Sequence, residues 1–522
     1  MDNEEVFRLA KPRKKGILSF IFSRFLIIAV LLGLQVAMYV MFFLWLRKYL
    51  SYFYLTMAVF TLIMTIYLFM SEIDNSAKLT WLLLIVALPI LGATLLLYTQ
   101  INLGHRVLQQ RAEEQINKTK DLIAQPAGVA EKLETEGRCV DDLSRYLCRS
   151  GCFPVYENTE VTYFPIGEDK FRAMLEEIAK AEHFIFMEYF IIEEGYMWGE
   201  ILKLLIRKSA EGVDVRVMYD GMCEMSTLPA DYWKLLEKEG IRSKAFAPII
   251  PILSSHYNYR DHRKILVIDG KTAFNGGVNL ADEYINRKMR FGHWKDTAVM
   301  LKGDAVRSFT LLFLQMWNID EKQPEYQPFL QDTGYIPEHP DGYVLPYGDC
   351  PLDNDKVGEM VYMDILNRAE SYVHVMTPYL ILDGELETAL KFAAQRGVDV
   401  KLILPGIPDK KLAFSLAKTH YKSLTEAGVR IYEYTPGFVH AKVWTCDDVL
   451  AVVGTINLDY RSLYHHFECA TYMYKTGCIP EIEKDFQETL RKCRPVTPES
   501  IKNEKWSYKL TGSLVKFIAP LM

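Results

Sequence analysis

The residues best suited to chemistry occur in a short phrase that the chain contains twice: His-x-Lys, then four residues, then Asp. The two copies are His262, Lys264 and Asp269, and His440, Lys442 and Asp447. A glycine-containing turn and an asparagine follow each copy, Asn279 in the first and Asn457 in the second. Two imidazoles, two ammonium groups and two amides form a set that suits a phosphodiester, because the cations neutralise its charge while histidines attack phosphorus or carry protons.

The spacing within each phrase has a physical logic. His and Lys two residues apart point to the same face of an extended segment. The apolar residues that follow Lys264 predict a buried strand, so the polar pair lies at the start of that strand, where a site can open. Asp269 and Asp447 come at the turns that end these strands. We therefore expect the two aspartates to support the site by holding a turn or a partner.

A two-step reaction fits this set of residues. One imidazole attacks phosphorus and forms a phosphohistidine, and the other protonates the departing alkoxide. Lys264 and Lys442 neutralise the phosphate, with Asn279 and Asn457 as substrate-binding donors. The spacing alone leaves open which histidine is the nucleophile. The chemistry calls for no metal or other cofactor.

Several other side chains are candidates for supporting roles. Each catalytic histidine needs an acceptor that fixes its tautomer, and Asp296 and Glu468 are the candidates, although structural salt bridges would explain both equally well. Glu188 and Tyr189 end an early predicted strand and are candidates to line the substrate cleft. Three further histidines are expected in the wall of the site or on the surface rather than in catalysis: His293, His465 and His466.

The two phrases lie within a repeated α/β pattern. The first half predicts helices at 171–181 and 198–210 and strands at 184–190 and 213–219; the second half predicts helices at 361–369 and 385–395 and strands at 372–376 and 398–404. Gly-Val-Asp-Val occurs at 212–215 and again at 397–400, and His440, Gly454 and Asn457 follow their counterparts at one constant interval. Such an ordered series predicts a duplicated α/β unit.

Three apolar runs occupy the N-terminal part, at about 25–46, 50–70 and 80–98. A helix of about 20 residues is roughly 30 Å long, the thickness of the hydrocarbon core of a bilayer. Pro89 and Gly92 interrupt the third run, which leaves open whether there are two or three full spans. A cleaved signal peptide fits poorly, because the first run begins late and further runs follow it. We therefore expect retained transmembrane helices in a multi-pass protein of the cell membrane.

The side of the membrane that the remaining chain faces stays open, because basic residues lie both before the first run and after the third. The expected organisation is a membrane domain (1–104), a linker or stalk (105–155), a first α/β domain (156–325), a linker (326–345), a second α/β domain (346–500) and a tail (501–522). The tail either lies on the bilayer or packs as a terminal helix.

The composition of the chain excludes some classes of binding partner. The net charge of -6 and the pI of about 6.1 argue against nucleic-acid binding, for which a strongly basic face is expected. An odd number of cysteines, nine, without regular spacing argues against a disulfide framework and favours free thiols. The oligomeric state is not indicated.

With both phrases established, the chain resembles the phospholipase D superfamily. The apolar N-terminal runs and the phrases Thr377-Pro-Tyr379, Pro436-Gly-Phe-Val-His440 and Asn457-Leu-Asp-Tyr-Arg-Ser462 narrow the resemblance to the bacterial cardiolipin synthases of that superfamily. The resemblance implies two similar α/β domains packed around one active site. It also implies phosphatidyl transfer between two phosphatidylglycerol molecules of the membrane, giving cardiolipin and glycerol, with His262 as the nucleophile and His440 as the acid and then the base.

Two other functions remain alternatives. A membrane-anchored phospholipase D would use the same residues with water as the acceptor and would release phosphatidic acid. A catalytically inactive membrane scaffold is the alternative from another class, and the intact pair of phrases argues against it.

Overall fold

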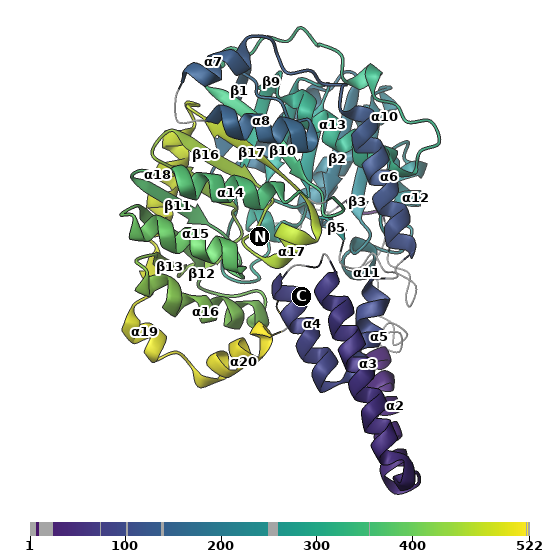
Figure 1. Cartoon of the computed structure of the whole chain (residues 1–522). Helices are drawn as coiled ribbons and strands as arrows, with labels where there is room; N and C mark the ends of the chain where they lie inside the picture. Colours follow the sequence, from purple (N-terminus) through teal and green to yellow (C-terminus); the bar gives the residue numbers. More distant parts are fainter. Residues whose placement is uncertain are drawn as a thin grey trace. The chain divides into compact units, whose positions relative to one another are not determined.

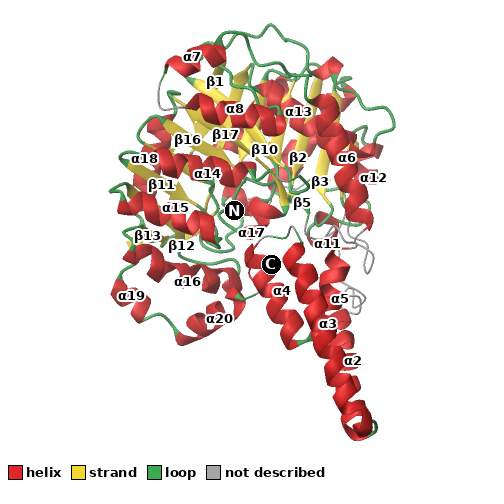
Figure 2. Cartoon of the chain, in the orientation of Figure 1, coloured by secondary structure: helices red, strands yellow, loops and turns green. Residues whose placement is uncertain are grey.

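The computed structural model describes residues 7–9, 24–71, 73, 75–100, 103–136, 140–248, 259–353, 355–517 and 519. The chain divides into two compact units. The body comprises residues 1–13, 108–248 and 258–513, and the apolar unit comprises residues 14–107, 249–257 and 514–522. Figure 1 follows the chain through both, and Figure 2 shows its strands, which within the described residues all belong to the body.

The first sheet of the body has seven strands in the order β1-β9-β7-β6-β2-β3-β4. Their bounds are β1 (Thr159–Phe164), β9 (Ala298–Gly303), β7 (Thr272–Gly276), β6 (Lys264–Ile268), β2 (Phe184–Tyr189), β3 (Asp214–Asp220) and β4 (Arg242–Phe246). The β2-β3-β4 half is parallel, with α10 (Tyr196–Ala210) between β2 and β3, whereas the other half is antiparallel. Strands β2, β6 and β7 are buried along their whole length, as expected for continuous apolar runs.

The second sheet repeats this order. Its main path is β10 (Tyr343–Asp349), β17 (His466–Tyr474), β16 (Leu450–Gly454), β15 (Val443–Cys446), β11 (Tyr372–Met376), β12 (Asp399–Pro405), β13 (Arg430–Tyr434) and β18 (Cys493–Pro495). Its first seven strands correspond one to one, in order and in direction, with those of the first sheet. The predicted duplication of an α/β unit is therefore confirmed, and we call the two copies the first and second lobes.

Helices cover both sheets, as Figure 2 shows. In the first lobe α9 (Gly167–Lys180) and α10 pack on one face, and α13 (Val306–Trp317) packs on the other, where Phe313 stacks on Phe186 at 4.6 Å between ring centroids. One hydrophobic cluster extends from α13 through the sheet of the second lobe. Further helices of the body are α11 (Cys223–Ser226), α12 (Tyr232–Lys238), η3 (Asp282–Ile285), η4 (Asn318–Asp320), η5 (Gln327–Phe329), α14 (Val357–Arg368), α15 (Gly384–Gln395), α16 (Lys411–Glu426), α17 (Tyr460–Tyr464), α18 (Ile479–Leu490) and α19 (Pro498–Lys502).

Two short strand pairs join the lobes in parallel. In one, β5 (Arg260–Asp261) of the first lobe pairs with the start of β17 of the second. In the other, β8 (His293–Lys295) of the first lobe pairs with β14 (Gly437–Val439) of the second. Each phrase histidine directly follows one of these strands, so the same hydrogen bonds that join the lobes also place the histidines.

The stretch 105–155, expected to be a linker or stalk, contributes to the core of the body. It forms α6 (Leu103–Thr119), α7 (Val129–Thr135) and α8 (Val140–Gly151). Leu133, Leu143 and Leu147 are almost completely buried in the cluster that the two lobes share. The predicted second linker behaves similarly, since Tyr326 and Leu330 are buried there as well. Both stretches therefore pack into the body, although the sequence analysis assigned them to linkers.

The apolar unit contains α2 (Arg24–Leu44), η1 (Arg47–Tyr49), α3 (Leu50–Met70), α4 (Asn75–Ala87) and α5 (Pro89–Gln100). Among the described residues, one helical stretch, Arg47–Met70, is long and apolar enough to cross a membrane. The third predicted run does not form one straight span, because it breaks between α4 and α5 at Pro89. A Cβ at Gly92 would lie 2.7 Å from the carbonyl carbon of Leu84, so the two short helices fold back on each other closely. Three spanning helices are therefore not established.

The last helix, α20, runs from Trp506 to Lys516. The eight cysteines within the described residues form no disulfide with one another.

Candidate active site

The backbone around each phrase histidine is held by the opposite lobe. The His262 N–H donates to the Phe467 carbonyl at 2.9 Å, and the His440 N–H donates to the Lys295 carbonyl at 2.7 Å. Both bonds continue the strand pairs that join the lobes. The structure thus brings the two phrases to one interface within the body.

The carboxylates that contact the two imidazoles are exchanged between the lobes. His262 Nδ1 of the first lobe lies 2.9 Å from both oxygens of Glu468, which belongs to the second lobe. His440 Nδ1 of the second lobe lies 2.7 Å from Asp296 Oδ2, which belongs to the first. When Nδ1 donates to its carboxylate, Nε2 carries the free lone pair, the arrangement that a nucleophile or a base requires.

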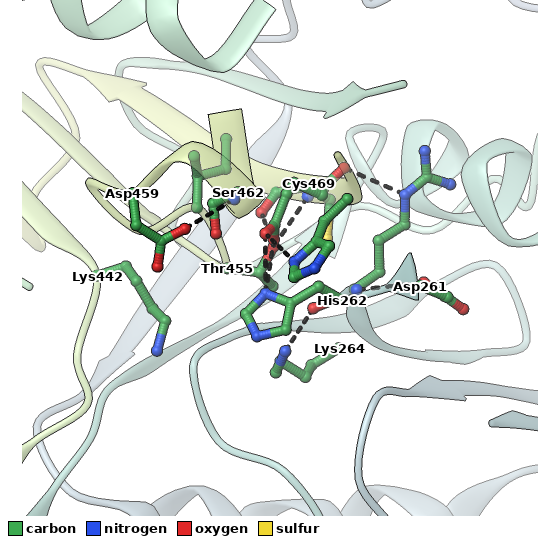
Figure 3. Close-up of polar contacts among 12 residues, drawn as sticks. Asp261, His262, Lys264, Lys442, Thr455, Asp459, Ser462 and Cys469 are labelled. Carbon is green, nitrogen blue, oxygen red and sulfur yellow. Dashed lines mark hydrogen bonds and ion pairs between the residues drawn. The ribbon is translucent and has the colours of Figure 1, made fainter. Parts of the chain in front are cut away.

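The two lysines are buried beside the histidines. Lys264 Nζ donates to the His262 carbonyl, and Lys442 Nζ donates to the His440 carbonyl and lies 2.9 Å from His440 Nδ1. Figure 3 shows the side chain of Lys264, from the first lobe, below the His262 ring and that of Lys442, from the second lobe, to the left of it. Burial is the main cause that lowers the pKa of Lys442 and of His440, and the charge of Lys264 in the other phrase lowers both further, so the two phrases share one electrostatic environment.

Burial controls the protonation of the site. It lowers the pKa of His262 well below its ordinary value, and burial together with Lys442 lowers the pKa of His440 to about 4. Burial also lowers the pKa of Lys264 to about 8 and that of Lys442 to about 7. In the free site at neutral pH both imidazoles are therefore uncharged. An anionic ligand would stabilise the charged form of the two lysines more than that of the other groups in the site.

The two acceptor carboxylates keep their charge despite being buried. Burial alone would raise the pKa of Asp296, but the neighbouring His440 and Lys442 outweigh it and the pKa falls. The pKa of Glu468 is lowered in the same way, with His262 as the main partner that outweighs burial. Both groups thus remain acceptors for Nδ1–H across the ordinary pH range.

The two asparagines differ in their contacts. Asn279 Oδ1 accepts from the Ile191 N–H at 3.0 Å, and its Nδ2 donates to the Tyr284 hydroxyl at 2.9 Å. Asn457 is buried, and its Oδ1 has no hydrogen-bond partner among the described residues. The amide of Asn457 is thus the more available of the two for a ligand.

Asp269 and Asp447 hold turns. The Asp269 carboxylate accepts from the backbone N–H groups of residues 182, 183 and 184, and the Asp447 carboxylate accepts from those of residues 370, 371 and 372. Both aspartates have positive φ, at 54° and 52°, in the turns that end β6 and β15. At about 3.3 Å per residue these turns lie a full strand length from the lysines, so the contacts suit a supporting role.

Glu188 and Tyr189 have interior contacts. Tyr189 is completely buried, and its hydroxyl lies 4.0 Å from Met174 Sδ in the helix layer of the first lobe. Glu188 is completely buried on the opposite face, 3.9 Å from Arg263 Nη1, and burial and then Asp261 raise its pKa well above its ordinary value. Since successive strand residues point to opposite faces, both side chains end in packed layers rather than in an open cleft.

Aromatic rings line both halves of the site. Phe190 and His466 flank His262, with ring centroids 4.9 and 5.3 Å away. Tyr284 and Trp294 flank His440 at 5.4 and 5.5 Å. His466 is thus a buried neighbour of His262 rather than a surface residue. His293 is partly buried and contacts the Tyr434 hydroxyl at 3.1 Å, and burial lowers the pKa of His465 to about 4.

Two contacts of the site were missed in the sequence. Thr455, in the glycine turn of the second lobe, donates to Glu468 Oε2. Lys170 on α9 is completely buried, donates to the Val278 carbonyl at 3.2 Å, and has its pKa lowered to about 7 by burial, against the raising effect of Asp296. Thr455 is the counterpart of Gly277 in the first half of the chain. A comparison of the two halves could therefore have singled out Thr455, because a hydroxyl stands there where the first half has glycine. A lysine on a helix gives no such signal, because it is ordinarily exposed.

Among the described residues, two groups of side chains have the composition and spacing of metal ligands. One is His262, His466 and Glu468, and the other is Glu359, Asp383 and Glu385; in each, the ligand atoms lie within 4.8 Å of one another. The first group is already used in the pairing of His262 with Glu468, and the chemistry inferred from the sequence needs no metal there.

Comparisons with known proteins identify the family of this chain. Residues 174–317 and 362–490 match the family described as "Cardiolipin synthase, PLD-like domain", one segment in each lobe. The chain is 31% identical over 505 residues to a cardiolipin synthase of Geobacillus kaustophilus, covering 96% of this chain and 99% of the relative. It is 33% identical over 463 residues to cardiolipin synthase 2 of Bacillus cereus, covering 87% and 88%. An uncharacterized protein of Streptococcus mutans is 58% identical over 457 residues, covering 88% and 99%.

A solved structure shares the fold. Phosphatidylserine synthase of Haemophilus influenzae superposes with a TM-score of 0.52 at 13% sequence identity, covering 69% of this chain and 95% of that one. This likeness concerns the fold alone, whereas the family match and the relatives extend over both lobes and most of the chain. The chain therefore belongs to the cardiolipin synthase family of proteins with phospholipase D-like domains.

Proposed function

We propose that this protein is a phosphatidyltransferase that joins two phosphatidylglycerol molecules into cardiolipin and releases glycerol. The observation that carries the proposal is the exchanged pairing of His262 with Glu468 and of His440 with Asp296, beside two buried lysines. Curated relatives named cardiolipin synthase align over most of this chain.

In the first step the phosphodiester of the donor lipid lies between Lys264 and Lys442. His262 Nε2 attacks phosphorus while Nδ1–H stays bonded to Glu468, and the bond from phosphorus to the head-group glycerol oxygen breaks. His440 gives its Nε2 proton to that oxygen, so that glycerol leaves as an alcohol. The product is a phosphatidyl group bonded to His262. The family resemblance assigns His262 this role, and its strongly lowered pKa favours the neutral, nucleophilic imidazole.

In the second step the glycerol hydroxyl of another phosphatidylglycerol gives its proton to His440 and attacks phosphorus. The bond from phosphorus to His262 Nε2 breaks, and cardiolipin leaves the site. His440 ends the cycle protonated, as the first step requires. Its pKa of about 4 belongs to the free site, where Lys442 and burial act on it. An anionic phosphate next to the ring favours the charged form and raises that pKa.

The lysines provide binding that increases in the transition state. Burial lowers the pKa of both lysines, which shows that the charged form of each is poorly compensated in the free site. A phosphodiester compensates them, and the extra charge on its oxygens as the nucleophile adds strengthens both contacts. Asn457 supplies an additional amide at the same interface.

The apolar unit supports a membrane location for this chemistry. We propose that the apolar helices insert into the membrane, with Arg47–Met70 as a span and α2 as its antiparallel neighbour. Cysteine substitutions at Lys48 and Asn75, which flank α3, would test this. One of the two should react with an impermeant maleimide in intact cells and the other only after permeabilisation. Equal reactivity of both in intact cells would contradict the span.

The function is tested by supplying purified protein with vesicles of phosphatidylglycerol and identifying the products by mass. Cardiolipin and glycerol in equal amounts are expected, and His262→Ala and His440→Ala should each abolish both. Phosphatidic acid with glycerol, in place of cardiolipin, would identify a hydrolase instead. If either variant restored cardiolipin to a synthase-deficient strain as well as the wild type does, a scaffold role would replace the proposed catalysis.

A further inference from the structure

Helix α20 presents two different faces. Tyr508, Gly512 and Val515 lie on the face that packs inward, where the Tyr508 ring lies 5.7 Å from that of Phe414 on α16. A Cβ at Gly512 would lie 2.3 Å from the Ser415 carbonyl oxygen, so only glycine permits so close an approach. These contacts hold one side of α20 against α16, so the opposite side of the helix faces away from the body.

The opposite side of α20 is an exposed apolar stripe. Trp506, Leu510 and Leu514 are 74%, 43% and 60% exposed, and they follow one another at intervals of four residues. At 3.6 residues per turn this spacing places all three on one face, and Phe517, 59% exposed, continues the row after the helix. Water-facing helices rarely present four large apolar side chains in a row. The stripe therefore indicates a site that binds another apolar surface.

A row of cations runs along the same stripe. Lys505, Lys509 and Lys516 are exposed and lie on one flank of it, between the apolar stripe and the seated face. In the part of the chain that the structure describes, none of them forms an ion pair with an acidic side chain; the nearby Glu504 is paired with Lys418. Apolar residues flanked by lysines match the boundary between acyl chains and anionic head groups.

The chain after α20 belongs to the apolar unit. Residues 514–517 cluster with the apolar helices, and the Phe517 carbonyl accepts from the Thr80 hydroxyl of α4 at 2.7 Å. The stripe therefore continues into the segment that packs with the helices we assign to the membrane. An anionic bilayer explains both the continuity with the apolar helices and the lysine row, because its acyl chains and head groups would contact them together. A partner protein would need an apolar surface and acidic groups in the same arrangement.

We propose that α20 is an interfacial helix that lies on an anionic phospholipid surface. Its apolar stripe (Trp506, Leu510, Leu514 and Phe517) enters the acyl boundary, and its lysine row (Lys505, Lys509 and Lys516) contacts the head groups. The helix is then a second membrane contact, separate from the apolar N-terminal helices and independent of the chemistry at His262. The proposal combines the two expectations for the tail, since α20 would pack on the body with one side and lie on the bilayer with the other.

Hydrogen–deuterium exchange of the full-length protein in nanodiscs tests this inference. Peptides covering 506–516 should exchange about tenfold more slowly in nanodiscs of phosphatidylcholine with phosphatidylglycerol than in nanodiscs of phosphatidylcholine alone. Leu510→Ser with Leu514→Ser should remove the protection, and Lys505→Gln with Lys509→Gln and Lys516→Gln should remove its dependence on phosphatidylglycerol. Phe392→Ser, which changes an apolar side chain on α15 that is 53% exposed, is the matched control and should leave the protection intact.

Three results would overturn the proposal: equal exchange in the two kinds of nanodisc, protection that survives both sets of substitutions, or protection in detergent that rises with protein concentration, which would identify a second copy of the chain as the occupant. The His440→Ala protein should show the same protection as the wild type. A failure of the proposed catalysis therefore leaves this measurement unaffected.

Discussion

At the scale of single residues, each imidazole has its own carboxylate from the opposite lobe, so the two roles can be tested with separate variants. A donor lipid whose leaving group needs no proton then distinguishes the acid from the nucleophile. Asp296→Asn should slow cardiolipin formation by roughly 10²- to 10⁴-fold, because His440 loses the anion that stabilises its charged form. With phosphatidyl-p-nitrophenol as the donor the leaving group needs no proton, so this variant should still release one equivalent of p-nitrophenolate in a burst and then stall.

Glu468→Gln is the matched variant for the other pair. It weakens the His262 nucleophile itself, so it should lose the burst with p-nitrophenyl donor as well as the turnover with phosphatidylglycerol. Quenched-flow measurement of the burst and mass spectrometry of the phosphorylated histidine peptide distinguish the two variants. A burst in Glu468→Gln together with none in Asp296→Asn would reverse the assignment of nucleophile and acid.

The lysines predict the alkaline side of the pH profile. In the free enzyme the pKa values of Lys442 and Lys264 are lowered to about 7 and about 8, so raising the pH through these values removes the charges that bind phosphate. The kcat/KM for phosphatidylglycerol in mixed micelles should therefore fall above pH 8, by about tenfold or more per pH unit. The permanently charged Lys442→Arg variant should shift the fall to higher pH, even if its maximum is lower. A wild-type profile that stays flat to pH 10 would contradict this account.

At the scale of elements, the two glycine turns are not equivalent, and the difference gives a sharp test. A Cβ at Gly277 would lie 2.1 Å from Asp296 Oδ1, so Gly277→Ala must push that carboxylate away from His440. Turnover should fall at least about 100-fold with little change in the melting temperature, since the disturbance falls on a catalytic contact. The control is Thr455→Ser at the corresponding place in the second lobe, which keeps the hydroxyl that donates to Glu468 and should retain most activity.

The same comparison of elements shows what the sequence could predict. The predicted strand 372–376 coincides with β11, and the strand 184–190 ends one residue beyond β2, because apolar alternation and flanking turns are local signals. The constant interval between the phrases predicted the repeated order of both sheets. The partners of the histidines were named, but not the exchange between lobes, because His262 and Glu468 are 206 residues apart and no local pattern fixes that register.

Other features depended on direction in space. Glu188 and Tyr189 are neighbours on β2, and their side chains point to opposite packed layers because successive strand residues face opposite sides of a sheet. Their position at the end of the strand had suggested that both line the cleft. The charged appearance of 105–134 likewise concealed residues such as Leu133, which is fully buried in the core. A polar sequence with few apolar positions still packs when those positions meet a large apolar surface built from distant segments.

At the scale of the whole body, the lobes are joined so extensively that a break in the connection should not separate them. The strand pairs β5–β17 and β8–β14 and the shared hydrophobic cluster lie between the lobes, whereas residues 331–334 of the connection are exposed. A protease site inserted after Gly334, where a side chain would meet nothing within 4 Å, should therefore be cleaved without loss of structure. The two fragments should co-purify on size exclusion in detergent and keep most of the cardiolipin synthesis of the uncut protein.

Each fragment carries one histidine and the carboxylate that the other histidine needs, so neither fragment expressed alone should form a phosphohistidine or release glycerol. Mixing a first fragment with His262→Ala and a second fragment with His440→Ala should also give no activity, because both substitutions then fall in one site. If that mixture were active, two independent sites would be needed, and the single active site formed between the lobes would have to be abandoned.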